Sequence, residues 1–276
     1  MSTYNTLVLS GNGTNAPCTL GALQLLYEQK ILCAQSLSSY YGTSSGSIIG
    51  TLLALGFEPL DILTYVCVNR CYSKVSGINL ANITGGGLLN FDTIESELTD
   101  IIISKVGYVP TLEDVKTLFN KTLVVVTYNL TTGLKEYVSA ETYPQLPVTK
   151  AIRMSCTFPF VFNPYWYNNC YYIDGGIVDN FPMYAAQLKP GNRCLGLYNN
   201  NPVKPYSPET TNYLELFLRL ITVFIASAAE NTPILGDNRL LQLSYEPSFF
   251  NFTSSTVELS KMFESGYKTC ATKLGL

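Results

Sequence analysis

The chain contains no histidine among its 276 residues. A Ser-His-Asp triad therefore cannot be built from it, and neither can a catalytic water held on a metal by histidines. The eight cysteines include no Cys-x-x-Cys pair, which argues against a structural zinc site. We expect neither a metal nor another cofactor.

Charge is scarce as well. Charged residues make up 13% of the chain and the formal net charge is −3. With a pI near 5.1, the sequence has no electrostatic footprint for nucleic acid. No run of like charges provides a polybasic membrane tether. Apolar residues make up 47%, as in a globular protein rather than a disordered segment.

Targeting and membrane-spanning segments are not evident either. The first 30 residues lack the basic segment and apolar core of a secretory signal. The best candidate for a membrane span, residues 213–229, is interrupted by Glu215 and Arg219, and the remaining apolar run is too short to cross a bilayer. We expect the cysteines to be free, buried thiols. Together these features predict a cytoplasmic protein, either free or peripherally bound to a membrane.

Short β-rich runs alternate with helical patterns along the chain. Strands are expected at 6–9, 37–41, 123–128, 135–139, 171–173 and 194–197, and helices at 20–26, 48–55, 59–71, 91–106, 111–119, 147–157, 211–229 and 256–273. In the 111–119 helix, Leu112, Val115 and Leu118 should face inward. This alternation predicts an α/β layer fold with a largely parallel central sheet. No linker, repeat or composition shift appears, so residues 1–276 are expected to form one domain.

The segment Gly42-Thr43-Ser44-Ser45-Gly46 stands between an expected strand and an apolar helix. This is the context of a nucleophile elbow, in which a serine is exposed at a sharp strand-to-helix turn. Gly42 and Gly46 would allow the turn and the close approach of neighbouring backbone. The start of the following helix favours negative charge beside Ser44. The same motif also fits an N-cap serine in a glycine turn, and by itself it does not separate the two interpretations.

The missing histidine leaves a carboxylate, a lysine or a partner's group to activate Ser44. Asp174 is the leading candidate because it follows an apolar strand and precedes Gly175 and Gly176. That position places it at the carboxyl end of a strand, where α/β folds assemble their sites. The alternative is an ordinary turn aspartate. Asp179 is the second candidate.

Four motifs, in this order, resemble those of the patatin-like phospholipase family. They are residues 9–13 followed by Gly21, the elbow at 42–50, the segment from Arg153 to Pro159, and Asp174-Gly175-Gly176 followed by residues 180–182. Residues 111–128 and 256–273 also follow the family pattern. The resemblance implies a three-layer α/β/α fold. It also implies a lipid acyl hydrolase, of phospholipase A or esterase type, that works through an acyl-enzyme.

The resemblance also assigns the site. It implies that Ser44 is the nucleophile and that Asp174 activates first the serine and then the water that clears the acyl-enzyme. The N–H groups of Gly11, Asn12 and Gly13 would hold the oxyanion. Supporting positions are Gly42, Gly46, Gly175, Gly176 and Arg153. The implied substrate is a lipid at a membrane or lipid-droplet surface.

The loop at 11–16 departs from the family pattern of three glycines, a basic residue and another glycine. Asn12 replaces the middle glycine of the three, and Ala16 replaces the last glycine of the pattern. Asparagine tolerates a positive φ better than most residues. Asn15 replaces the basic residue, so a positive charge near the oxyanion is missing. Arg153 and Lys150 are candidate replacements. The departure predicts lowered or altered activity.

Two alternative functions stay open: an acyltransferase of the same fold, and a catalytically silent lipid-binding or regulatory protein. The aromatic segment 165–167, close to Tyr171 and Tyr172, fits either an interfacial anchor for lipid or a hairpin of packed aromatics. The glycines at 85–87 fit a flexible turn better than a phosphate-binding loop, because no Lys-Ser/Thr follows them.

Overall fold

The computed structural model describes residues 4–75, 87–200, 216, 219–223, 225, 233–245 and 251–276. Its main sheet contains β1 (Thr6–Leu9), β2 (Ser39–Thr43), β4 (Thr122–Asn129), β5 (Leu134–Val138), β7 (Tyr165–Tyr167), β8 (Cys170–Asp174), β9 (Cys194–Asn199) and β10 (Arg239–Leu243). The strands β10, β9, β1, β2 and β4 lie in that order and run parallel. The strands β5, β8 and β7 add antiparallel pairs beyond them. The predicted largely parallel sheet is confirmed.

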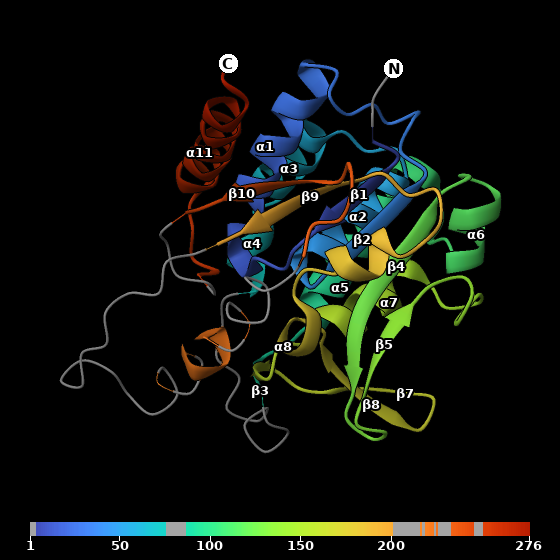
Figure 1. Cartoon of the computed structure of the whole chain (residues 1–276). Helices are drawn as coiled ribbons and strands as arrows, with labels where there is room; N and C mark the ends of the chain where they lie inside the picture. The colour runs from blue at the N-terminus through green and yellow to red at the C-terminus, as the bar shows by residue number, and fades with distance from the viewer. Residues whose placement is uncertain are drawn as a thin grey trace.

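Helices cover this sheet (Figure 1). The helices with described bounds are α1 (Ala16–Glu28), α2 (Ser45–Ala54), α3 (Pro59–Val68), α4 (Cys71–Val75), α5 (Asp92–Val106), α6 (Leu112–Thr117), α7 (Val148–Cys156), α8 (Gly176–Asp179), α9 (Met183–Gln187) and α11 (Thr256–Leu274), with a 3-10 turn at Gly13–Asn15. A second, two-stranded sheet pairs β3 (Gly87–Leu89) with β6 (Phe160–Phe162) in parallel.

Alternating residues of the strands enter two different hydrophobic clusters. Leu7 and Leu9 of β1 pack in the larger cluster with residues of α1, α2, α7 and α11. Val8, between them, packs in a smaller cluster with Met183 and Ala186 of α9. Because successive side chains of a strand point to opposite faces, the sheet is buried on both sides. This is the three-layer α/β/α arrangement expected from the sequence.

The helices α1 and α11, near the two ends of the chain, lie side by side (Figure 1). Their backbones approach closely at two glycines. A methyl group added at Gly21 would lie 1.8 Å from the Phe263 carbonyl oxygen, and one added at Gly266 would lie 1.8 Å from that of Cys18. Gly21, the glycine that follows the 9–13 motif, is therefore explained by helix packing.

Two expectations about helices are wrong. The segment 59–71 is not one helix, because α3 ends at Val68 and Arg70 takes a φ of 51° before α4 begins. Leu118 does not face inward and is 67% exposed. The helix α6 ends at Thr117, so Leu118 lies past the face on which Leu112 and Val115 are buried.

Most of the predicted 211–229 helix lies outside the described residues, as do Gly85 and Gly86; Gly87 belongs to β3. Within the described part of the chain, no single helix is long and apolar enough to cross a membrane. The helices α2 and α3 pass that test only as a pair joined through a bend of 117°.

Candidate active site

Ser44 lies at the junction of β2 and α2 with φ 52° and ψ −128°. A non-glycine residue in this region costs on the order of 1–3 kcal/mol, so its surroundings must hold it there. The Ser44 N–H donates to Ser155 Oγ at 2.9 Å, and the Ser44 carbonyl accepts from the N–H and the hydroxyl of Ser47 at 2.8 and 2.6 Å. The strained turn aims Ser44 into a cavity, as a nucleophile elbow requires.

Gly42 and Gly46 serve this turn by leaving space, since neither has a positive φ. A methyl group at Gly46 would come within 2.5 Å of the Leu9 carbonyl oxygen, and one at Gly42 within 2.5 Å of that of Gly46. From the sequence, the two glycines are expected to make the sharp turn. In the structure Ser44 itself takes the positive φ, and the glycines let the start of α2 rest against β1.

Topology brings Asp174 to Ser44. The strand β5 pairs with residues 125–129 of β4, so β2, which pairs with residues 122–126, and β8, which pairs with residues 127–129, must share the other edge of β4. They meet there end to end, with Thr43 opposite Val126 and Asp174 opposite Thr127. Asp174 thus ends a strand as expected, but that strand runs antiparallel to β4 and points at the end of β2.

The Asp174 carboxyl is buried, with 1% of the residue exposed. Its Oδ1 accepts the Gly176 N–H at 2.7 Å, and its Oδ2 has no hydrogen-bond partner among the described residues. Burial raises its pKa to about 7, although the nearby Ser44 hydroxyl and the Gly176 N–H both lower it. The Ser44 hydroxyl is thus close to this carboxyl without reaching hydrogen-bond geometry. A carboxylate with a pKa near neutrality is suited to accept a proton.

Asp179, the second candidate base, is occupied elsewhere. Its Oδ2 accepts the Tyr137 hydroxyl at 2.6 Å and pairs with the Lys135 ammonium at 3.2 Å. This carboxylate links α8 to β5.

The three expected oxyanion donors differ in their partners. The Gly11 N–H donates to the Asn180 carbonyl oxygen at 3.1 Å, and the Asn12 N–H donates to Ser45 Oγ at 2.8 Å. Within the described part of the chain the Gly13 N–H makes no hydrogen bond, and Gly13 lines the cavity beside Ser44. The positive φ in this loop is at Gly13, with a value of 51°. Asn12 has a φ of −145°, so the tolerance of asparagine for positive φ is not used here.

The cation missing at Asn15 is not replaced by Arg153 or Lys150. Arg153 pairs with Asp92 and Glu95 at 2.7 and 2.6 Å, and Lys150 pairs with Glu95 at 2.5 Å. Both cations therefore tie α7 to α5. Asn15 itself is fully buried, and its amide oxygen and nitrogen have no hydrogen-bond partner among the residues described.

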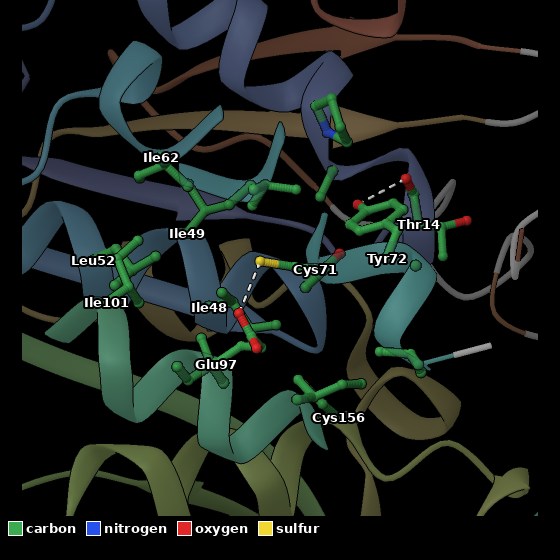
Figure 2. A pocket seen from close by; sticks show the side chains of 18 of the residues that line it. Thr14, Ile48, Ile49, Leu52, Ile62, Cys71, Tyr72, Glu97, Ile101 and Cys156 are labelled. Atoms are coloured by element: carbon green, nitrogen blue, oxygen red, sulfur yellow. Dashed lines mark hydrogen bonds between the residues drawn. The ribbon is translucent and has the colours of Figure 1, made fainter. Parts of the chain in front are cut away.

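An apolar cavity of about 160 Å³ opens beside Ser44 and Gly13. Its walls come mainly from α1, α2, α3, α4 and α5, and Leu20 of α1 is one of the residues that line it. The lining also includes Ile48, Ile49, Leu52, Ile62, Ile101 and, from the end of α7, Cys156 (Figure 2). Burial raises the pKa of the Cys156 thiol well above its usual value, so the group stays neutral. Such a space suits a hydrocarbon chain whose polar end lies at the serine.

Sequence reasoning missed the supporting roles of Ser45, Ser155 and Asn180. Ser155 lies within the 153–159 motif and Asn180 within the 180–182 motif, so the motifs marked both positions. Their hydrogen bonds join segments more than 100 residues apart, and no local pattern shows such bonds. Among the described residues, no three His, Cys, Asp or Glu side chains are grouped so as to hold a metal ion.

Two curated viral proteins are similar to this chain. "Probable lipid hydrolase 463L" of Invertebrate iridescent virus 6 is 33% identical over 190 residues, covering 66% of this chain and 63% of that protein. "Uncharacterized protein R571" of Acanthamoeba polyphaga mimivirus is 28% identical over 186 residues, covering 66% and 61%. The chain thus matches less than two thirds of the length of either relative.

Solved structures show the same fold at low identity. VipD from Legionella pneumophila aligns with a TM-score of 0.59 and 17% identity, over 99% of this chain and 67% of that one. ExoU in its complex with SpcU from Pseudomonas aeruginosa aligns with a TM-score of 0.54 and 18% identity, over 99% and 52%. A family model described as patatin-like phospholipase matches residues 7–186, which is more than half of the chain. The chain belongs to the patatin-like phospholipase family.

Proposed function

We propose that this chain is a lipid acyl hydrolase with a Ser44–Asp174 dyad. The observation that carries the proposal is an elbow serine that lines an apolar cavity, next to a buried carboxylate with an open oxygen. Membership of the patatin-like phospholipase family and the similarity to a viral protein named a probable lipid hydrolase support the reaction class.

In the first half-reaction Asp174 takes the proton of the Ser44 hydroxyl while Oγ attacks the ester carbonyl carbon. The N–H of Gly13 faces the developing oxyanion, and one such donor is commonly worth about 3 kcal/mol. Protonated Asp174 then returns its proton to the leaving alcohol. The fatty acyl group stays on Ser44, with its chain in the cavity.

In the second half-reaction a water molecule takes the place of the alcohol. Asp174 accepts a proton from this water as its oxygen attacks the acyl carbon, and Ser44 Oγ leaves with that proton. The products are a free fatty acid and the regenerated dyad. The substrates we propose are fatty acyl esters of phospholipids at a membrane surface, cleaved in the manner of a phospholipase A.

The test is release of fatty acid from mixed phospholipid vesicles by wild type and by Ser44→Ala, Asp174→Asn and Asp179→Asn. We expect the first two variants to lose activity and Asp179→Asn to keep it, because its carboxylate is bound to Tyr137 and Lys135. Equal release by wild type and Ser44→Ala would refute the proposal. Adding an alcohol acceptor separates a hydrolase from an acyltransferase by product.

One observation favours a catalytically silent lipid-binding protein: two of the three expected oxyanion N–H groups already have partners. A fluorophosphonate probe distinguishes this case, since it labels only an activated serine. Labelling of wild type but not of Ser44→Ala supports catalysis. No labelling, together with retention of fatty acid in the cavity, supports the silent protein.

A further inference from the structure

The loop that carries Gly13 is held from outside by two groups that contact Thr14. The Tyr72 hydroxyl of α4 donates to the Thr14 carbonyl oxygen at 3.0 Å (Figure 2). The Asn251 N–H donates to Thr14 Oγ1 at 2.9 Å. Both bonds therefore hold the residue next to Gly13. In this chain the loop has the neutral Asn15 where the family pattern has a basic residue.

The Tyr72 hydroxyl is a well-fixed donor. Its helix, α4, is tied to α5 through the Glu97 carboxylate. This carboxylate accepts from the Cys71 thiol at 3.2 Å and pairs with the Lys74 ammonium at 2.5 Å. The Tyr72 ring packs against Phe252 with the ring centroids 6.3 Å apart. Burial raises the pKa of Tyr72, so the phenol keeps its proton at any ordinary pH.

We infer that Tyr72 is a positioning residue that orients the Gly13 N–H toward the oxyanion. Gly13 has no side chain and takes a left-handed φ of 51°, so the direction of its N–H depends on how its neighbours are held. Tyr72 fixes the carbonyl of the next residue. The inference rests on the proposed function and adds to it a residue from outside the family motifs.

This role explains how the loop can work without a cation. A neutral hydroxyl supplies direction and no charge, so the Gly13 N–H would stabilise the oxyanion through its orientation, without a nearby cation. Tyr72 also lines the cavity beside Ser44. A bound acyl chain would therefore contact the side chain that holds the loop.

The test compares Tyr72→Phe with wild type in hydrolysis of one short-chain and one long-chain acyl ester. The variant keeps the ring in the cavity and removes only the hydroxyl. We expect kcat to fall about tenfold for both esters, less than the loss of a whole oxyanion donor, with KM within about twofold. Tyr267→Phe is the matched control. It removes a hydroxyl of α11 that donates to Glu28, the last residue of α1; neither residue lines the cavity, so kcat should be unchanged.

A second measurement does not depend on turnover. Hydrogen–deuterium exchange of the peptide spanning residues 11–16 should speed up in Tyr72→Phe and not in Tyr267→Phe, with both variants melting within a few degrees of wild type. Unchanged kcat, or unchanged exchange at 11–16, overturns the inference. A rise in KM with kcat unchanged would also overturn it, because Tyr72 would then only bind the acyl chain of the substrate. If wild type and Ser44→Ala are equally inactive, the proposed function itself has failed.

Discussion

Gly11 and Asn180 are joined by two hydrogen bonds, each 3.1 Å long. The Gly11 N–H donates to the Asn180 carbonyl oxygen, and the Asn180 side-chain amide donates back to the Gly11 carbonyl oxygen. The pair is buried and links the loop before α1 to the segment that follows Asp174. The loop proposed to hold the oxyanion is thereby fixed relative to the carboxylate proposed as the base.

Asn180→Ala should therefore reduce both stability and turnover. Removing the amide leaves the buried Gly11 carbonyl without its donor, at a cost of about 1–2 kcal/mol. We expect kcat to fall as well, because the 11–13 loop loses one of its two ties to the Asp174 segment. Urea denaturation and ester hydrolysis measure the two effects. Asn192→Ala, which breaks a similar bond to the Ala186 carbonyl away from the site, should cost stability only.

The pH dependence of turnover should report Asp174. Its pKa of about 7 means that the base form predominates only above neutrality. We expect kcat/KM for an uncharged ester to rise between pH 6 and 8 and then to level off. A flat profile from pH 5 upward would contradict this, since it would require an Asp174 pKa near the ordinary value of 3.8.

The same shift has a consequence for stability. Because the folded pKa lies above the unfolded value of 3.8, the stability contributed by protonated Asp174 is complete below about pH 4 and is lost as the pH rises through about 7. Asp174→Asn has no such loss. We expect this variant to be more stable than wild type at pH 8, by a few kcal/mol, and the difference to shrink at pH 5. An equal difference at both pH values would contradict the expectation.

Two glycines of the same helix should respond in opposite ways to alanine. In Gly46→Ala the new methyl group would lie 2.5 Å from the Leu9 carbonyl oxygen, and we expect a loss of about 3 kcal/mol or more. In Gly50→Ala the nearest atom lies 3.7 Å away, an ordinary contact, and the helix should gain about 0.5–1 kcal/mol. Thermal unfolding of both variants checks this, and similar effects would mean that α2 does not rest on β1 as described.

The aromatic segment at 165–167 is part of the β7–β8 hairpin, whose turn residues Asn168 and Asn169 both take positive φ. Trp166 and Tyr171 pair across it, are about half exposed, and have ring centroids 4.5 Å apart. The hairpin extends past the carboxyl end of β4, because the Leu130 N–H donates to the Tyr171 carbonyl oxygen. Ser44 follows the carboxyl end of β2, which runs parallel to β4, so the hairpin projects from the same end of the sheet.

Exposed Trp and Tyr side chains suit the boundary between lipid headgroups and acyl chains. We therefore expect Trp166→Ala to lower the affinity for phosphatidylcholine vesicles, measured by sedimentation, roughly tenfold, or by about 1–2 kcal/mol. Tyr184→Ala, an equally exposed aromatic on α9, should have no effect. Equal binding by wild type and Trp166→Ala would leave the hairpin as a packed structural element.

The sequence by itself determined the strands and helices that carry the strongest periodic patterns, and the type of sheet they form. Hydrophobic runs such as 6–9 and 123–128 are local signals, and they predicted β1 and β4 closely. The absence of histidine left carboxylates and lysines as the candidate bases, and the ordered motifs named Ser44 and Asp174. Helix breaks were harder to predict: nothing local in 59–71 showed that Arg70 would take a positive φ.

Only the tertiary structure decided how these residues are supported. The meeting of β2 and β8 on one edge of β4 depends on strand pairing over long sequence separations. The same is true of the partners that occupy the Gly11 and Asn12 N–H groups, of the carboxylates that hold Arg153, and of the Tyr72 hydroxyl on Thr14. Such contacts form between segments whose separation in space is set by the packing of the whole sheet and its helices. A local pattern can therefore mark a residue for chemistry without showing which of its hydrogen-bonding groups remain open.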